Sequence, residues 1–216
     1  MTPRSAERIA DIEIPDSVLA REATELVRDA AGELLYDHSR RVYLFGALRG
    51  RHRGLDFDPE LLYVAALFHD LGLTQKYATS EQRFEIDGAD AAREFLLRHG
   101  LAPERARTAW TAIALHTTPE IPYHMEPEVA LVTAGVEVDV LGLGFDETTR
   151  EQRDAVVAAH PRPDFKRRIL AAFTEGIAHR PDTAFGNVKA DVLAHFSPGF
   201  VRTDFVTVIE NSEWSQ

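Results

Sequence analysis

The segment from Leu61 to Leu71, LLYVAALFHDL, limits the possible folds of this chain more than any other stretch. Its side chains are apolar nearly all the way round a helix, and a helix of that kind is buried on every side. The tripeptide DPE at 58–60 carries the signals of a helix start, namely a capping carboxylate, a proline and an acidic residue in the first turn. The sequence therefore predicts a central buried helix whose last turn contains two polar residues, His69 and Asp70.

Helical periodicity also dominates the rest of the chain. Apolar residues recur at spacings of three and four, while the alternation typical of strands is scarce. We therefore predict an all-α fold: a single helical bundle with additional C-terminal helices, forming one domain over residues 1–216. The expected helices cover residues 16 or 17 to about 31, from about 38 onward, 58–71, 87–99, from 103 onward, 126 to about 143, 147–159, 164–178, a shorter helix between 181 and 198, and 202–211.

The amino-acid composition excludes more functions than folds. The chain contains no cysteine, so any metal ion must be bound by nitrogen and oxygen ligands. Its formal net charge of −11 opposes binding to nucleic acid and to anionic lipid. Its apolar runs are far shorter than the ~20 residues that cross a bilayer. We expect a cytoplasmic protein with a small-molecule substrate and without a nucleic-acid or membrane partner; a homo-oligomer stays open.

Polar residues within these apolar helices are the candidates for a functional site. Asp139 lies three residues after Val136 on the buried face of a late helix, and His38 begins the second helix. Burying an unpaired carboxylate costs roughly several kcal/mol, which a shared cation would offset. A His–Asp hydrogen bond or a helix end facing water would explain His69 and Asp70 alone. Because three separate helices contribute such groups, a metal site explains them about as well as these alternatives do. Its predicted ligands are His38, His69, Asp70 and Asp139.

The order of these residues resembles the H…HD…D signature of HD-domain metalloproteins, and Leu71-Gly72 after the His-Asp pair is similar to a common form of that motif. The resemblance covers about residues 36–143, which we take as the core of the metal site. The chain looks similar, more narrowly, to the branch that contains cyanamide hydratases. This narrower resemblance is carried by the strings DHSRRVYLFG (37–46), ALFHDLGLT (66–74), RFEIDGADAA (83–92), ALHTTP (114–119) and PEVALVTAGVEVDVLG (127–142).

The resemblance implies a divalent metal ion, zinc or iron with manganese as an alternative, and an enzyme that adds water to a small nitrile-like substrate. A metal ion lowers the pKa of a bound water toward about 7 and so supplies hydroxide at neutral pH. His116 or Glu85 would then protonate the substrate nitrogen. Thr74 would offer a hydroxyl group, and Lys76 a charge, to the same pocket. A second metal ion would use His116 and His124.

Two other functions remain open. In the first, the site hydrolyses a phosphoester, and Lys76, Arg83 or Arg40 binds the phosphoryl oxygens. Against this alternative, the chain lacks the glutamate that several HD nucleotidases carry after the HD pair. It also has Leu73 where many HD phosphodiesterases carry a lysine. In the second, the site is not catalytic, and the metal stabilises a module that binds a small ligand.

Overall fold

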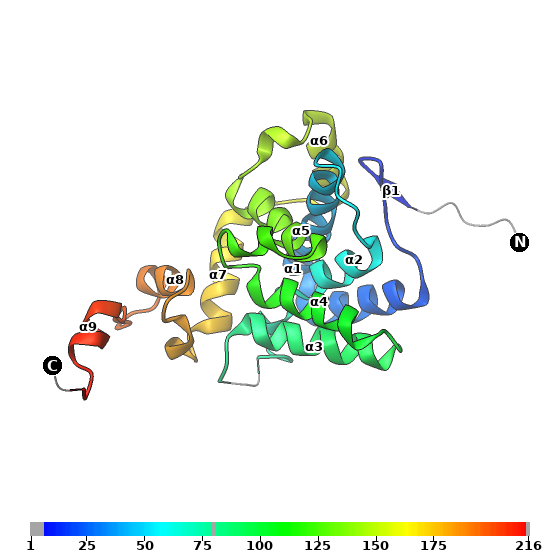
Figure 1. The fold of residues 1–216 in the computed structure, drawn as a ribbon. Coiled ribbons are helices and arrows are strands. Elements are labelled where there is room, and N and C mark those ends of the chain that lie inside the picture. Colours follow the sequence, from blue (N-terminus) through cyan, green and yellow to red (C-terminus); the bar gives the residue numbers. More distant parts are fainter. Residues whose placement is uncertain (1–6, 79–80, 215–216) are drawn as a thin grey trace, which may run out of the picture.

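The computed structural model describes residues 7–78 and 81–214, and its regular structure is almost entirely helical. Figure 1 shows a bundle of helices with the first strand, β1, and the last helix, α9, on opposite sides. The predicted all-α class is confirmed. A two-residue antiparallel hairpin, β1 (Arg8–Ile9) and β2 (Ile12–Glu13), precedes the bundle. The helices are α1 (Val18–His52), α2 (Pro59–Phe68), α3 (Phe84–Arg98), α4 (Pro103–Leu115), α5 (Pro127–Val136), α6 (Arg150–Ala159), α7 (Phe165–Ile177), α8 (Lys189–Phe196) and α9 (Phe205–Glu210), with short 3-10 turns at η1 (Leu71–Leu73), η2 (Ile121–His124), η4 (Phe145–Glu147) and η5 (Pro181–Ala184) and a π turn at η3 (Glu137–Leu141).

Helix α2 is the buried helix expected at the centre of the fold. The Asp58 side chain accepts hydrogen bonds from the backbone N–H groups of Glu60 and Leu61, which fixes the helix start. Every residue from Leu61 to Phe68 is buried. The helix packs against α1, α4, α5 and α3, so its last turn points into the bundle instead of into water.

Helix α1 joins the two helices that the sequence predicted at the N-terminal side. Gly32 interrupts it with a φ of +66°, a left-handed conformation that glycine adopts readily. The first half therefore ends near residue 31, as predicted. The second half resumes directly after Gly32 and not near His38, so His38 lies in mid-helix and not at a helix start.

Close contact between α1 and α5 positions the turn that follows α5. A Cβ atom on Gly135 would lie 2.1 Å from the Val42 carbonyl oxygen, so only glycine allows this approach. The helix predicted over 126–143 ends at Val136 and continues as the π turn η3, which Gly142 terminates in a left-handed conformation. Single π turns of this kind are frequent at functional sites. This one contains Asp139.

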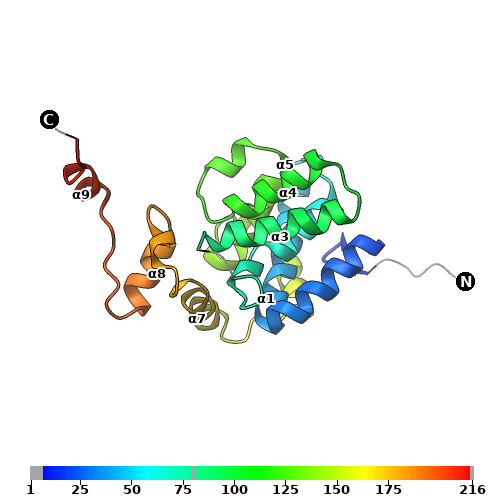
Figure 2. The same cartoon turned by 90° about the horizontal axis from the view of Figure 1, so that it is seen from below.

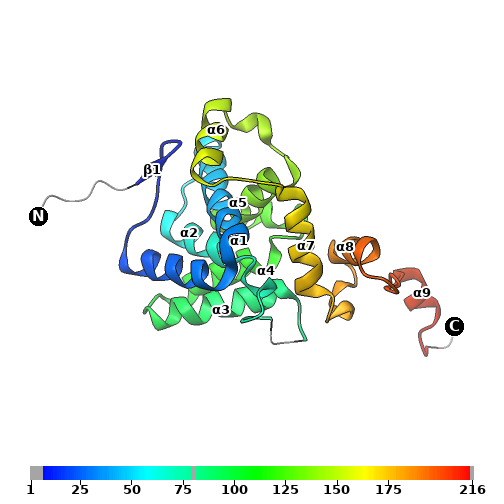
Figure 3. The same ribbon diagram turned by 180° about the vertical axis from the view of Figure 1, so that it is seen from behind.

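The C-terminal helices pack against one side of the bundle. Helices α7 and α8 bury a second apolar cluster together with Leu73 and Phe84 from η1 and α3. Helix α9 and the segment before it extend away from the body, and residues 201–214 are exposed (Figures 2 and 3). Within the described residues, no helix has the length and apolarity needed to cross a membrane. That residues 1–216 form one domain stays a prediction.

We expect Gly135→Ala to destabilise the protein, although alanine normally stabilises a helix by roughly 1 kcal/mol relative to glycine. The new methyl group would overlap the Val42 carbonyl and separate α5 from α1. Overpacking of this kind costs about 1–3 kcal/mol. Urea denaturation measures the loss. The exposed-face control Glu94→Ala should shift the free energy of unfolding by less than about 0.5 kcal/mol. An unchanged or raised midpoint for Gly135→Ala would contradict this packing.

Candidate metal centre

His69 and Asp70 follow the last residue of α2 and are 0% and 2% exposed. His69 Nδ1 donates a hydrogen bond to the Ala66 carbonyl at 2.7 Å. Because that nitrogen carries the proton, the neutral ring presents the lone pair of Nε2. Neither carboxylate oxygen of Asp70 has a hydrogen-bond partner among residues 7–78 and 81–214. A buried carboxylate without such partners is energetically unfavourable unless a cation compensates it.

His38 brings a second imidazole to the same point from α1. Its Nδ1 donates to Asp139 Oδ2 at 2.7 Å, so its Nε2 also presents a lone pair. Nε2 of His38 lies 3.2 Å from Nε2 of His69. Two lone pairs repel at that distance, and a cation or proton between them removes the repulsion. The His38 side chain is 1% exposed, so bulk water does not screen this repulsion.

His116, which directly follows α4, brings a third imidazole. Its Nδ1 donates to the Ile113 carbonyl at 2.7 Å, and its Nε2 lies 3.5 Å from Asp70 Oδ1. That Nε2 has no hydrogen-bond partner in the described chain. The ring packs edge-on against His69, with 4.9 Å between the centroids. Three histidines from different helices therefore direct Nε2 toward one carboxylate.

The spacing of these donor atoms fits a metal ion. His69 Nε2 lies 3.2 Å, and His38 Nε2 3.5 Å, from Asp70 Oδ2. Ligands about 2.1 Å from one tetrahedral metal ion lie about 3.4 Å from one another. His38, His69 and Asp70 form a buried group of potential ligands in which all donor atoms lie within 4.8 Å of each other. Unpartnered donors, burial and spacing agree, so the residues present fit a divalent cation.

Two of the three pKa directions in this group favour the protonation states that a metal ion requires. The exception is His69, whose pKa burial alone would lower but the neighbouring carboxylate of Asp70 raises. Burial alone would raise the pKa of Asp70, but the imidazoles of His69 and His116 lower it well below the ordinary value. Burial lowers the pKa of His38 despite the nearby carboxylate of Asp139. A metal ion binds the ionised carboxylate and the neutral imidazole.

Asp139 was predicted as the fourth ligand, and the structure does not bring it into this group. Its carboxylate accepts two hydrogen bonds from Arg41, at 2.8 and 2.9 Å, in addition to the one from His38. Arg162 Nε lies 3.1 Å from the same carboxylate. These partners engage both oxygens, so Asp139 fixes the ring orientation of His38 from outside the group. Hydrogen bonds of this kind raise the affinity of a histidine ligand for metal.

Three other predictions on site residues differ from the structure. Thr74 donates its hydroxyl to the Leu71 carbonyl within its own turn. Lys76 is exposed and lies over the Tyr77 ring, outside the histidine group. His124 is exposed on η2, so it does not join His116 as part of a second metal site. Lys76 and His124 are thus exposed, and the hydroxyl of the buried Thr74 is engaged within its own turn, which spacing along the sequence does not reveal.

Glu85 lies in the first turn of α3 and is fully buried. Its Oε1 accepts hydrogen bonds from Thr117 at 2.6 Å, Lys189 at 2.6 Å and Arg83 at 3.1 Å. Burial alone would raise its pKa, but Lys189 and then His116 lower it to about 2. Glu85 is therefore ionised at neutral pH and holds no proton for a substrate.

Two charged residues of this region were missed by the sequence analysis. Arg41 and Lys189 are both 0% exposed, which is unusual for their residue types. The spacing of His38 and Arg41 along one helix face could have indicated a shared partner. No sequence signal marks Lys189. Its partner, Glu85, lies 104 residues earlier in the chain, so the pairing is not visible in any local pattern.

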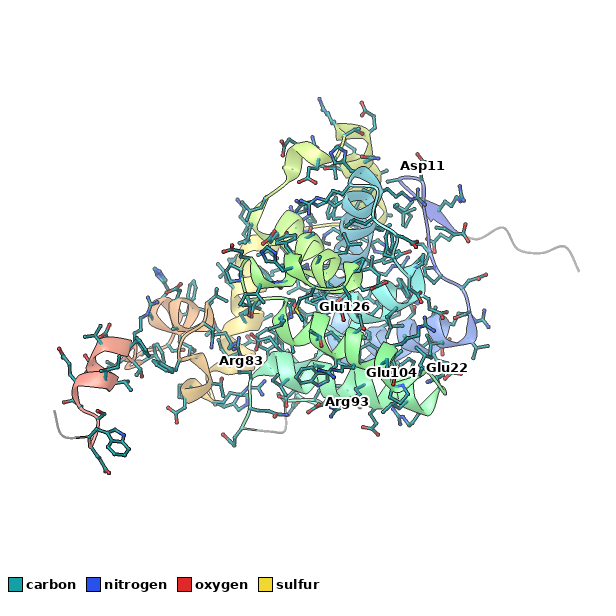
Figure 4. All side chains as sticks on the ribbon, viewed as in Figure 1. Asp11, Glu22, Arg83, Arg93, Glu104 and Glu126 are labelled. Atoms are coloured by element: carbon teal, nitrogen blue, oxygen red, sulfur yellow. The ribbon has the colours of Figure 1, made fainter. Side chains whose placement is uncertain are left out.

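A cleft of about 400 Å³ lies at the turn that follows α4, and His38, His69, Asp70 and His116 are not among its lining residues. Thr117, which directly follows His116, and Arg83 line it together with the N-terminal end of α8. Arg83 lies where the body meets the α7–α8 segment (Figure 4). A larger cavity of about 980 Å³ is lined by residues between 178 and 205 and contains none of the predicted site residues. The smaller cleft is lined by Arg83 and Thr117, which both donate hydrogen bonds to Glu85, so we take it as the candidate substrate site.

Comparisons with known proteins bear on this arrangement. Residues 35–158, more than half of the chain, match the family described as HD domain. A stretch of 76 residues is 34% identical to the curated protein "Putative phosphohydrolase YueE" of Bacillus subtilis (strain 168), covering 31% of this chain and 43% of that protein. The chain thus matches less than half the length of this relative. The narrower resemblance to cyanamide hydratases is not shown by these matches.

We expect the group to bind one divalent ion through His38, His69 and Asp70. His69→Ala and Asp70→Ala should each remove it, because each deletes a donor atom. Asp139→Asn should weaken binding by about 10–100-fold, since it loosens the hydrogen bonds that orient His38. Elemental analysis and chelator competition on purified protein measure both effects. The control His124→Ala should bind metal as the wild type does; equal metal content in all four variants would refute the assignment.

The buried Glu85 carboxylate should make folding sensitive to acid. Its pKa is about 2 in the folded protein and 4.5 ordinarily, so the unfolded chain binds more protons between these pH values. Its contribution is present above pH 4.5 and is lost as the pH falls toward 2, on the order of 3 kcal/mol in total. Unfolding titrations over this range should give a shallower pH dependence for Glu85→Gln than for wild type or the exposed control Glu104→Gln. Parallel curves would contradict the assignment.

Proposed function

Because the chain belongs to the HD-domain family, we propose that it is a metal-dependent phosphohydrolase acting on a small phosphoester. The observation that carries this proposal is the buried Asp70 carboxylate, which three imidazole Nε2 atoms surround and which has no hydrogen-bond partner in the described chain. The partial similarity to a protein named as a phosphohydrolase favours hydrolysis over hydration.

His38, His69 and Asp70 would hold the ion, with His116 beside them. Imidazole with carboxylate suits zinc or iron, with manganese as an alternative, better than it suits magnesium or calcium, which prefer oxygen ligands. When bound, such an ion supplies a water of lowered pKa and polarises a phosphoryl oxygen. Asp139 and Arg41 keep the His38 ring aimed at the group.

The chain's own side chains then determine how a phosphoester is held. Of the three basic residues considered for its oxygens, Lys76 is exposed and points elsewhere, and Arg40 donates to Tyr36 and Tyr63. Arg83 lines the cleft. In this proposal it is the residue that binds the phosphoryl oxygens. Glu85 is ionised and holds no proton for the leaving oxygen. Of the two acids expected from the sequence, only His116 is left for that role, which it would fill from Nε2 in the protonated ring.

Hydration of a nitrile was the function we first expected from the sequence. It uses the same metal group, but the ionised Glu85 removes one of its two expected proton donors, and the matched relative is named for phosphohydrolysis. A metal-stabilised binding module without catalysis is the third alternative. Both are outcomes of the experiment that follows.

Metal-loaded protein should release phosphate from at least one member of a panel of nucleoside monophosphates, sugar phosphates and phosphodiesters. The diesters are assayed with an added phosphatase, which frees phosphate from their monoester product. Asp70→Asn should reduce the rate by at least about 100-fold, because it removes the charged ligand. Cyanamide, scored for urea, belongs in the same panel. Urea without phosphate release would replace this proposal with the hydratase, and bound metal without either product would favour the binding module.

A further inference from the structure

A buried ion pair next to the cleft is not explained by the metal group. Lys189 Nζ lies 2.6 Å from Glu85 Oε1, and both side chains are 0% exposed. Lys189 begins α8 and lies outside residues 35–158, which match the HD domain. The pair therefore joins the C-terminal segment to the HD part of the chain.

Attachment of the C-terminal segment does not account for this pair. A buried ion pair often contributes less to stability than apolar residues of the same volume. The same segment is already tied to α3 by a second buried pair, Arg180 with Asp87. A lysine ammonium group can donate three hydrogen bonds. Among the residues that the structure describes it makes one, to Glu85, with the face of the Phe84 ring 5.2 Å away. The burial of Lys189 against Glu85 therefore needs another explanation.

Glu85 connects this pair to the cleft. The same Oε1 that binds Lys189 also accepts hydrogen bonds from Arg83 and Thr117, and both of these residues line the cleft. Two buried atoms here have no hydrogen-bond partner among the described residues: Arg83 Nε and Glu85 Oε2. Unsatisfied buried polar atoms are uncommon in proteins, and these two lie beside an open cleft.

The charges around the cleft show what Lys189 changes. Arg202 lines the cleft and is paired with Asp191 of α8 at 2.9 Å. Without Lys189, Glu85 would compensate Arg83 in the same way. Arg83 is itself paired with Glu85 at 3.1 Å, but one carboxylate cannot balance two cations. With Lys189 also on Glu85, a net positive charge therefore remains at Arg83 for a ligand. Its side chain is 35% exposed.

The cleft also adjoins the metal group. Thr117 follows His116 in the sequence, and the Phe84 ring packs against the His116 ring with 5.6 Å between centroids. Lys189 approaches that same phenylalanine ring. An anion at Arg83 would therefore sit beside the ligand group and not on a distant surface.

We propose that this cleft is a phosphate subsite in which Arg83 contacts the anion and Lys189 is a positioning residue that, by neutralising Glu85, leaves Arg83 free to do so. The proposal rests on the proposed function, because it names the phosphoryl group as the ligand. It makes α8 part of the active site. The arginine geometry suits a phosphate group, which accepts hydrogen bonds from a guanidinium group in pairs.

Inorganic phosphate is the probe, titrated calorimetrically into metal-free and metal-loaded full-length protein. Arg83→Gln should weaken phosphate binding by roughly tenfold or more, because it removes a charge-assisted contact. Lys189→Met should weaken it by a similar factor, since Glu85 then compensates Arg83. The double variant Glu85→Gln/Lys189→Met should recover the affinity, because the competing carboxylate is gone while the glutamine oxygen still accepts hydrogen bonds from Arg83 and Thr117.

The matched control is the double variant Asp87→Asn/Arg180→Met, which replaces the other buried pair of the same segment. It should leave phosphate affinity unchanged, whatever its effect on the thermal midpoint. Unaltered affinity in Arg83→Gln would overturn the subsite. Failure of the Glu85→Gln/Lys189→Met variant to recover would overturn the role of Lys189. Phosphate binding in the metal-free protein does not depend on turnover, so these outcomes are separate from failure of the proposed function.

Discussion

The rest of the site depends on one electrostatic constraint, the buried negative charge of Asp70. Neither of its oxygens accepts a hydrogen bond within the described residues, and three imidazole nitrogens lie 3.2 to 3.5 Å away. A carboxylate in such surroundings requires a cation. The surrounding hydrogen bonds serve this requirement. His38 and His69 each have Nδ1 engaged, which leaves Nε2 for the ion, and the hydrogen bond of His116 Nδ1 leaves its Nε2 facing Asp70.

The fold delivers these groups by close packing of helices. His69 and Asp70 come from the end of α2, at the centre of the bundle. His38 comes from α1, which α5 approaches closely because residue 135 is a glycine. The π turn after α5 then holds Asp139 against Arg41. On the other side, α8 adds Lys189 beside Glu85. The HD part of the chain thus forms the metal group, and the C-terminal segment shapes the cleft next to it.

Much of the fold could be predicted from the sequence because it depends on local patterns. The apolar run from 61 to 71 predicted the buried helix, and the order of His38 and the His69-Asp70 pair indicated the metal group. What the sequence did not reveal depends on partners far along the chain. Asp139 was expected to bind metal, but Arg41, 98 residues away, engages its carboxylate. Glu85 was expected to donate a proton, but Lys189 keeps it ionised.

Whether a metal ion binds at Asp70 is tested most directly by X-ray diffraction from crystals soaked in zinc, recorded on both sides of the zinc absorption edge. We expect one anomalous peak within about 2.3 Å of an Asp70 carboxylate oxygen and of the Nε2 atoms of His38 and His69. A site without a peak, in which Asp70 instead accepts hydrogen bonds from protonated histidines, would contradict it.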